Sequence, residues 1–420
     1  MTRLTRLPNG LTIVTAEMPH MASVSLGLWV GVGGRHEPAE LSGASHFIEH
    51  LLFKGTRKRS AKQISQDVEG IGGDLNAFTG EENTCYYSKA RHDKFTDLLD
   101  VVMDMFHNSK FARVEIDKER GVIKEELAMY LDQPQQHVQE ILNATLWPDH
   151  PLGRSLTGTE QTLDGLTRER LLAYQRSHYV ADAAIVAAAG RLKHEQVVRA
   201  VTRFARHFHR GERPQFLPVS GEQITPRVNL FTKQTEQTQL ALGIRTCSRH
   251  DERRYALRLL NTMLGENMSS RLFQVIREDR GLAYSISSGL SFFDDVGVLN
   301  ISAGLDTENL PVVLKLVARE LRRFIKTAPT AAELRRARDY VIGQIELSLE
   351  STTNQMMWLG EQLLAYGKIT PPVEVEKRLR AVTPGQIRAA ARDFFRPERL
   401  NLALVSPLKR DTRLVDLLTS

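Results

Sequence analysis

The chain has 420 residues, 41% of them hydrophobic and 25% charged, which is typical of folded globular proteins and too long for one ordinary core. Lys and Arg number 56 against 50 Asp and Glu, and this net charge of +6 is scattered along the chain without a finger or basic-helix motif, which argues against a nucleic-acid-binding protein. No apolar run approaches the roughly 18 residues that span a bilayer, so we expect no membrane association.

The cysteines and the N-terminus bear on the compartment. Cys85 and Cys247 lie far apart in the sequence and offer no disulfide framework, which suits a reducing environment. The N-terminus, MTRLTRLPNGLTIV, lacks a long apolar core followed by a small-residue cleavage site, so we expect no signal peptide. The expected location is therefore cytoplasmic.

The first expected element is a β-hairpin, because Pro8-Asn9-Gly10 is a turn sequence between two apolar runs. Strands and long helices then share the chain, which predicts the α+β class, with antiparallel sheets packed by helices. The long predicted helices cover residues 61–69, 113–131, 310–325 and 331–349.

The segment SHFIEHLLF, residues 45–53, carries a metal-binding pattern. His46 and His50 share one face of a helix because positions i and i+4 are neighbours, and two imidazoles suit Zn²⁺ while leaving room for a third ligand and a water. Glu49 lies on the same side, where a carboxylate can take a proton from that water without being a ligand. The order H-x-x-E-H is that of an inverted zinc-peptidase motif. The alternative is a pair of histidines on the polar face of an amphipathic helix.

The helix predicted at residues 113–131 supplies a third candidate ligand. Steps of about 100° per residue place Glu119 and Glu126 inside a broad apolar face, whereas Glu125 falls outside it, where a solvated carboxylate belongs. Acids on a buried face need a partner, and a metal ion would be one. Glu126 is the better-placed ligand, and Glu119 a residue that would support a ligand; a pair of salt-bridged acids is the alternative. The apolar residues of this face are Ile116, Val122, Ile123, Leu127, Met129 and Tyr130.

The chain reads as two copies of one unit at an offset of 216 residues. Residues 24–28 (VSLGL) match residues 240–244 (LALGI), and a Thr-capped helix, an aromatic residue and an apolar strand follow both Leu166 and Val382. Two matches at one offset favour duplication over accidental similarity. The three predicted segments are a zinc-binding N-terminal domain (1–210), a linker rich in Pro and Gly (211–228) and a homologous, metal-free C-terminal domain (229–420).

The chain resembles the pitrilysin/insulinase metallopeptidases, peptidase family M16, and most closely the branch of mitochondrial processing peptidase and its bacterial relatives. In that family a glutamate ligand follows the last His of an inverted HxxEH motif by some 76 residues, and a second glutamate precedes this ligand by seven; here these are Glu126 and Glu119. The flanking residues 53–56 (FKGT) and 119–123 (ERGVI) also resemble the family. The resemblance covers essentially the whole chain and implies a bound Zn²⁺.

The resemblance also implies substrate-binding residues. GGDLNAFT, residues 72–79, is similar to the family's GGxxNAxT edge strand, to which substrate adds as an extra strand. In the second copy, Arg277 and Tyr284 stand where the family carries an Arg and a Tyr that face the zinc site and contact substrate. The resemblance therefore implies that both are catalytic residues, with Tyr284 helping to stabilise the oxyanion. Residues 257–265, the counterpart of the motif, hold no His and no carboxylate. The implied residues of the edge strand are Asn76, Ala77, Phe78 and Thr79.

Relatives close a chamber from four such domains, so the resemblance implies that this chain pairs with itself or with a related subunit. The zinc site of one chain would then face Arg277 and Tyr284 of its partner. The implied function is a zinc endopeptidase for short or unfolded peptides, with Glu49 as general base. The alternatives are a non-catalytic member, a catalytic chain that needs a different homologous partner, and a binding module with a structural zinc, which would want a fourth protein ligand.

Overall fold

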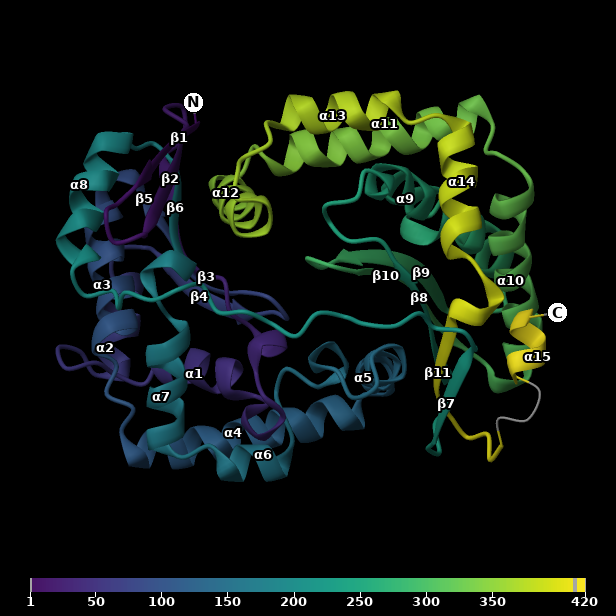
Figure 1. Ribbon diagram of the computed structural model, residues 1–420, viewed down its shortest axis with the longest axis horizontal. Coiled ribbons are helices and arrows are strands. Elements are labelled where there is room, and N and C mark those ends of the chain that lie inside the picture. Colours follow the sequence, from purple (N-terminus) through teal and green to yellow (C-terminus); the bar gives the residue numbers. More distant parts are fainter. Residues whose placement is uncertain (1, 411–413, 420) are drawn as a thin grey trace. The chain divides into compact units, whose positions relative to one another are not determined.

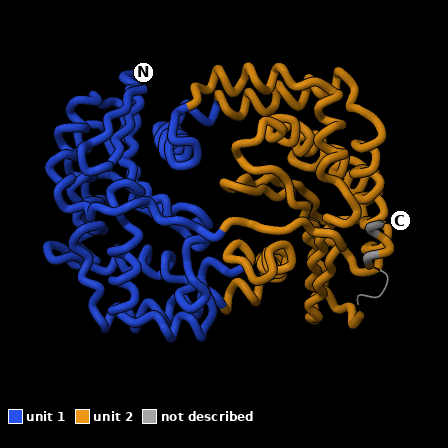
Figure 2. Tube along the Cα trace, in the orientation of Figure 1, with its two compact units in different colours: residues 1–127, 154–217, 347–369 blue, residues 128–153, 218–346, 370–420 orange. Residues whose placement is uncertain are grey.

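The computed structural model describes residues 2–410 and 414–419, which divide into two compact units (Figure 2). Each unit contains one β-sheet covered by helices (Figure 1). The predicted class, α+β with two homologous domains, is thereby confirmed. Unit 1 comprises residues 1–127, 154–217 and 347–369, and unit 2 comprises residues 128–153, 218–346 and 370–420.

The sheet of unit 1 has six strands in the order β1-β2-β6-β3-β5-β4. The pairs are antiparallel except β2 with β6, which are parallel and are joined by the long segment that contains β3, β4, β5 and helices α1 to α7. The predicted hairpin is present, since β1 and β2 flank the turn at Asn9. The strands are β1 (Thr2–Arg6), β2 (Thr12–Glu17), β3 (Ser23–Val30), β4 (Asp74–Thr79), β5 (Thr84–Arg91) and β6 (Ala184–Gly190).

The sheet of unit 2 has five strands in the order β7-β11-β8-β10-β9, again with one parallel pair, β7 with β11. This order repeats the last five positions of the first sheet. The offset of 216 also holds in the structure, because β6 and β11 begin at residues 184 and 400. The strands are β7 (Arg227–Thr232), β8 (Thr238–Thr246), β9 (Ser285–Phe292), β10 (Gly297–Leu305) and β11 (Leu400–Ser406).

The predicted long helices are present within a few residues of their expected ends, and the predicted Thr caps form: the side chains of Thr167 and Thr383 accept hydrogen bonds from the backbone at the starts of α7 and α14. The helices beginning in the first half of the chain are α1 (Ala44–Leu52), α2 (Ala61–Glu69), α3 (Phe95–Asn108), α4 (Arg113–Asp132), α5 (Pro134–Leu146), α6 (Glu160–Gly165), α7 (Arg168–His178) and α8 (His194–Ala205). Those of the second half are α9 (Arg253–Asn261), α10 (Leu310–Lys326), α11 (Ala331–Ser348), α12 (Thr352–Tyr366), α13 (Pro372–Ala381), α14 (Pro384–Phe394) and α15 (Leu414–Thr419).

Each sheet is covered on one face by a helix from the other half of the sequence. The first half contributes α5, whose residues Val138, Leu142 and Leu146 pack against β8 and β11 of unit 2. The second half contributes α12, which packs against β2, β3 and β6 of unit 1. The two halves therefore exchange one helix each.

A glycine in each sheet makes room for the exchanged helix. A side chain at Gly27 of β3 would meet the sulfur of Met356 on α12 at 2.3 Å. A side chain at Gly243 of β8 would meet Leu146 of α5 at 2.8 Å. These are equivalent positions of the VSLGL and LALGI segments, so the repeated glycine is explained by the close approach of the covering helix.

The compact units differ from the sequence segments in these exchanged helices. The segment predicted as the first domain, 1–210, includes residues 128–153, which belong to unit 2, and the segment 229–420 includes residues 347–369, which belong to unit 1. Between α8 and β7, residues 211–226 form neither helix nor strand. This segment is anchored to unit 1 where Arg213 donates to the carbonyl of Leu364 (3.0 Å).

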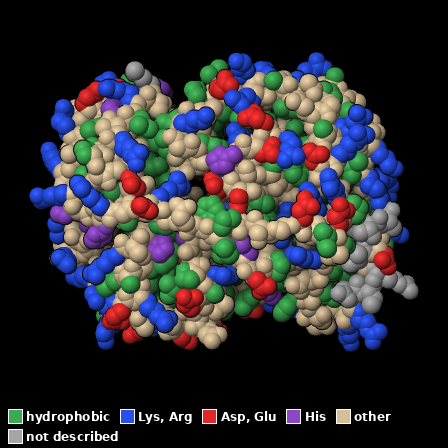
Figure 3. All heavy atoms as spheres, viewed as in Figure 1, with side chains coloured by type: hydrophobic (Ala, Val, Ile, Leu, Met, Phe, Trp, Pro, Cys, Tyr) green, Lys and Arg blue, Asp and Glu red, His purple; other side chains and the backbone are tan. Residues whose placement is uncertain are grey.

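The surface is mixed in charge. Basic and acidic side chains are interspersed over the face shown in Figure 3, in keeping with a small net charge. Among the described residues, no helix combines the length and the apolar character that crossing a membrane requires.

Candidate metal centre

Helix α1 turns its apolar side chains inward and its titratable side chains outward. Phe47, Ile48 and Leu51 are buried in the core of unit 1. His46 and His50 lie on the other face, half-buried, with ring centroids 4.6 Å apart. The i, i+4 spacing therefore brings both imidazoles to one place, as predicted from the motif.

Glu126 of α4 reaches the same place. Its Oε2 lies 3.7 Å from Nε2 of His46 and 3.8 Å from Nε2 of His50. Ligand atoms about 2.0–2.1 Å from a tetrahedral Zn²⁺ lie roughly 3.3 Å apart, so both distances from Glu126 are close to those of a zinc site. Of the described residues, these alone bring three such ligand atoms within 4.8 Å of one another.

The buried face of α4 is narrower than the periodicity of its sequence predicts. Glu119 and Ile123 are buried and Glu125 is exposed, as expected. Val122 and Met129, predicted on the buried face, are instead 49% and 46% exposed. The prediction was wrong for these two because α4 packs along one edge of the face only, so apolar residues at the other edge stay in solvent.

Glu119 supports His50 from the side away from Glu126. Its Oε2 lies 3.1 Å from Nδ1 of His50, and its Oε1 forms an ion pair with Nζ of Lys54 at 2.8 Å. The Glu119 side chain is only 4% exposed, so this carboxylate needs both partners. A carboxylate at Nδ1 favours the tautomer with the proton on Nδ1, which leaves Nε2 of His50 free to bind a metal.

Nδ1 of His46 has no hydrogen-bond partner although it is buried. Burial, followed by the neighbouring His50, lowers the pKa of His46 to about 4, whereas Glu126 opposes that shift. His46 is therefore neutral near pH 7, the state that a metal ligand requires. The donor set of two imidazoles and one carboxylate fits Zn²⁺.

Glu49 lies beside the three candidate ligands without belonging to them. Its Oε2 accepts a short hydrogen bond from the hydroxyl of Thr79 on β4. Burial raises the pKa of the Glu49 carboxyl above its ordinary value, and the Thr79 hydroxyl opposes that rise. A half-buried carboxylate with a raised pKa suits proton transfer near neutral pH.

The predicted substrate residues of the first copy occupy an edge strand. Strand β4, which carries Asn76 to Thr79, is the last strand of its sheet and pairs with β5. Asn76 accepts from the backbone N–H of Ala77 (2.8 Å), and Phe78 packs edge-on against Trp29 with ring centroids 5.6 Å apart. The open side of such a strand can pair with an extended peptide.

Arg277 and Tyr284 lie in unit 2. The Arg277 guanidinium stacks on the ring of Phe273 at 5.0 Å, and Tyr284 is 61% exposed just before β9. Both are surface residues in their own unit, and their contact with substrate stays a prediction.

The sequence reasoning missed one residue of this neighbourhood, Glu37. Its side chain is buried, and its carboxylate accepts hydrogen bonds from the backbone N–H groups of Gly43 and Ser45. Burial raises the pKa of this carboxyl to about 7, against the effect of Ser45 and Gly43. A lone acid in a loop nine residues before His46 has no periodicity, and no pattern would have found it.

Comparison with known proteins gives the family. Residues 12–160 match the family model described as Insulinase (Peptidase family M16), and residues 165–341 match Peptidase M16 inactive domain. The chain belongs to peptidase family M16. This confirms the resemblance drawn from the motifs.

Relatives and solved structures cover nearly the whole chain. An uncharacterized zinc protease of Streptomyces coelicolor is 40% identical over 97% of this chain and 90% of its own length, and one of Bacillus subtilis is 37% identical over 95% and 97%. The crystal structure of a protease from Helicobacter pylori matches with a TM-score of 0.91 at 21% identity, covering 97% of this chain and 99% of that one. The last match shows the fold alone.

Proposed function

We propose that this chain is a zinc-dependent endopeptidase. One observation carries the proposal: His46, His50 and Glu126 bring three ligand atoms within 4.8 Å of one another, beside a carboxylate that is not among them. Membership of the peptidase family and the zinc protease names of its relatives support it.

A zinc ion bound there would supply Lewis-acid chemistry, making a water more acidic and polarising a peptide carbonyl. Glu49 takes the proton from the attacking water, since its carboxylate lies beside the three candidate ligands and is not one of them. It then gives that proton to the leaving amine of the peptide. The hydroxyl of Thr79 holds the Glu49 carboxylate in place through both transfers.

Substrate binding is proposed along β4. An extended peptide adding to this edge strand would run past Thr79, which contacts Glu49, so its scissile bond would come to the base. Such pairing needs an extended segment, which favours short or unfolded peptides over folded proteins.

The test is zinc content and hydrolysis of a quenched peptide library by the purified chain, with and without a chelator. About one zinc per chain and cleavage that the chelator abolishes are the expected results. Zinc without cleavage would favour the alternatives of a missing partner subunit or a non-catalytic member. Absence of zinc would overturn the proposal.

We also propose that the active unit is a pair of chains, either two copies or one copy with a related subunit, with Arg277 and Tyr284 of one chain serving the metal centre of the other. A complementation experiment tests the homodimer. A Glu49→Gln chain and an Arg277→Ala/Tyr284→Phe chain should each be poorly active. Mixed, unfolded and refolded together, they should regain about a quarter of wild-type activity, because random pairing restores one composite site in four. No regain would exclude composite sites in a homodimer.

A further inference from the structure

Glu37 makes an unusual contact for a loop carboxylate. It is 3% exposed, and its two oxygens point to the start of α1: Oε2 accepts from the N–H of Gly43 at 2.7 Å and Oε1 from the N–H of Ser45 at 2.6 Å. Such bonds to a charged acceptor are short and strong. Glu37 thus serves as the cap of helix α1, which begins seven residues later at Ala44.

The helix needs this external cap. The first N–H groups of a helix have no partner within it, and the residue at the capping position of α1 is Gly43, which has no side chain to offer. A negative charge at this end is also favoured by the helix dipole. Ser45 is the residue directly before His46, so the capped turn is the one that carries the first candidate ligand.

The backbone of Glu37 is itself held in place. Its carbonyl accepts from the guanidinium of Arg154 at 2.9 Å. The hydroxyl of Ser45 also lies 3.3 Å from that of Tyr174. A carboxylate buried in this way costs free energy unless it is fully hydrogen-bonded, so its geometry is fixed by its partners.

Arg35, two residues before Glu37, contacts the turn that follows the edge strand β4. The N–H of Arg35 donates to the carbonyl of Glu81 at 2.8 Å, and its guanidinium pairs with Glu82 at 2.7 Å, both in the turn between β4 and β5. Thr79, which contacts Glu49, ends β4 two residues before Glu81. One short segment therefore braces both the turn after Thr79 and the start of α1.

We propose that Glu37 is a positioning residue for the metal centre: it fixes the first turn of α1 and so keeps His46 in register with His50 and Glu126. This inference rests on the proposed zinc site. It concerns the affinity for the metal, because a frayed first turn would release His46 while His50 and Glu126 stay on their own supports.

The test compares Glu37→Gln with Glu40→Gln. The amide at position 37 keeps the shape but has one carbonyl oxygen, so it can accept one of the two backbone bonds. Glu40 is an exposed glutamate three residues away and is the matched control. Zinc affinity is measured by competition with a chelating dye, and unfolding of the metal-free proteins by calorimetry.

We expect Glu37→Gln to bind zinc about 10-fold or more weakly than wild type, with Glu40→Gln unchanged and the metal-free proteins unfolding within a few degrees of one another. Glu37→Asp, which keeps both oxygens on a shorter stem, should fall between wild type and Glu37→Gln. Zinc affinity of Glu37→Gln within about twofold of the control overturns the inference, even if its Tm falls, since that result means a purely structural cap.

Hydrogen exchange of the metal-free proteins separates this inference from the proposed function. Residues 43–47 should exchange faster in Glu37→Gln than in Glu40→Gln, whether or not wild type binds zinc. Wild type without zinc, combined with faster exchange, would remove the proposed function and leave Glu37 only as the cap of the first turn of α1. Equal exchange would remove the positioning role alone.

Discussion

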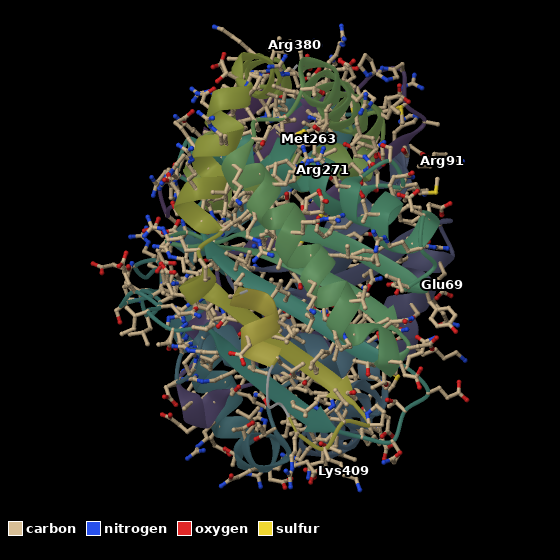
Figure 4. All side chains as sticks on the ribbon, turned by 90° about the vertical axis from the view of Figure 1, so that its right-hand side faces the viewer. Glu69, Arg91, Met263, Arg271, Arg380 and Lys409 are labelled. Atoms are coloured by element: carbon tan, nitrogen blue, oxygen red, sulfur yellow. The ribbon has the colours of Figure 1, made fainter. Side chains whose placement is uncertain are left out.

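Each unit sets a helix against the edge strand of its sheet: α1 against β4 in unit 1, and residues Thr262–Glu266 (η6), which continue α9, against β9 in unit 2. In unit 1 the half-buried face of that helix carries His46, Glu49 and His50. In unit 2 the positions 216 residues later are Thr262, Gly265 and Glu266, so neither histidine is repeated. The buried face is kept, because Met263, labelled in Figure 4, corresponds to the buried Phe47.

The long helices α4 and α11 show the same contrast at an offset of 218. Their buried apolar positions correspond, Ile116 with Leu334 and Ile123 with Val341. At this offset Glu119 corresponds to the buried Ala337, and Glu126 to Gln344. The duplicated helix is retained, and the two carboxylates are not.

The difference teaches that the candidate metal centre is built from side chains that the duplicated fold does not need. Unit 2 builds its core with an alanine where unit 1 buries a carboxylate, and that carboxylate is tolerated because Lys54 and His50 pair with it. Unit 2 has ion pairs at other positions of its helices. One is the bidentate pair of Arg271, labelled in Figure 4, with Glu333 of α11. Replacing unit 1 residues by their unit 2 counterparts should therefore remove chemistry and leave the fold.

The largest expected effect is on turnover by Glu49→Gln. The amide cannot accept a proton from water, so kcat should fall by about 1,000-fold or more. Zinc content should remain that of wild type, because Glu49 is not among the three atoms that converge. Turnover and metal content are measured on the same preparation, and substantial residual activity would remove Glu49 as the base.

The second largest effect is expected for Glu126→Gln, which places at this position of α4 the residue type of its counterpart Gln344 in α11. Loss of the charged ligand should weaken zinc binding by at least about 100-fold. Glu125→Gln is the control, because Glu125 is the neighbour of Glu126 in sequence, is exposed and is not among the three candidate ligands. Metal analysis after dialysis checks both, and the reverse pattern would show that the wrong glutamate had been assigned.

Much of the candidate metal centre, and the likeness of the two units, could be predicted from the sequence. The i, i+4 pair and the helical phase of Glu126 depend on local geometry alone, so spacing placed all three near one point. The offset of 216 likewise anticipated the shared strand order.

The rest depends on contacts between distant segments. Nothing local says that α5 and α12 exchange partners, since each only presents an apolar face that either sheet could bury. The same limit applies to the exposed Val122 and Met129, because periodicity gives the phase of a face and not its width. Glu37 acts across a loop and has no pattern at all.

Glu119→Ala, the residue of the unit 2 position, should have a smaller effect than loss of a ligand. Without its carboxylate, Nδ1 of His50 loses its acceptor and Lys54 its partner, so zinc affinity should fall by about 10- to 100-fold. The metal-free protein should unfold at a temperature close to that of wild type, since Ala is accepted at this position of α11. A large drop in Tm would show that α4, unlike α11, needs the buried carboxylate for the stability of the fold.

The smallest expected effect is on kcat, when one hydrogen bond between a helix and an edge strand is removed in each unit. Thr79→Val keeps the shape of the side chain and removes its bond to Glu49, so kcat should fall by about 3- to 10-fold while zinc content is unchanged. The matched change in unit 2 is Ser288→Ala, because the Ser288 hydroxyl on β9 donates to Asn261 of α9 at 2.7 Å. That variant removes a bond between a helix and an edge strand without touching the base, so its kcat should equal that of wild type. Equal losses in both variants would mean that the contact serves only to hold a helix to its strand, and that Thr79 has no part in orienting Glu49.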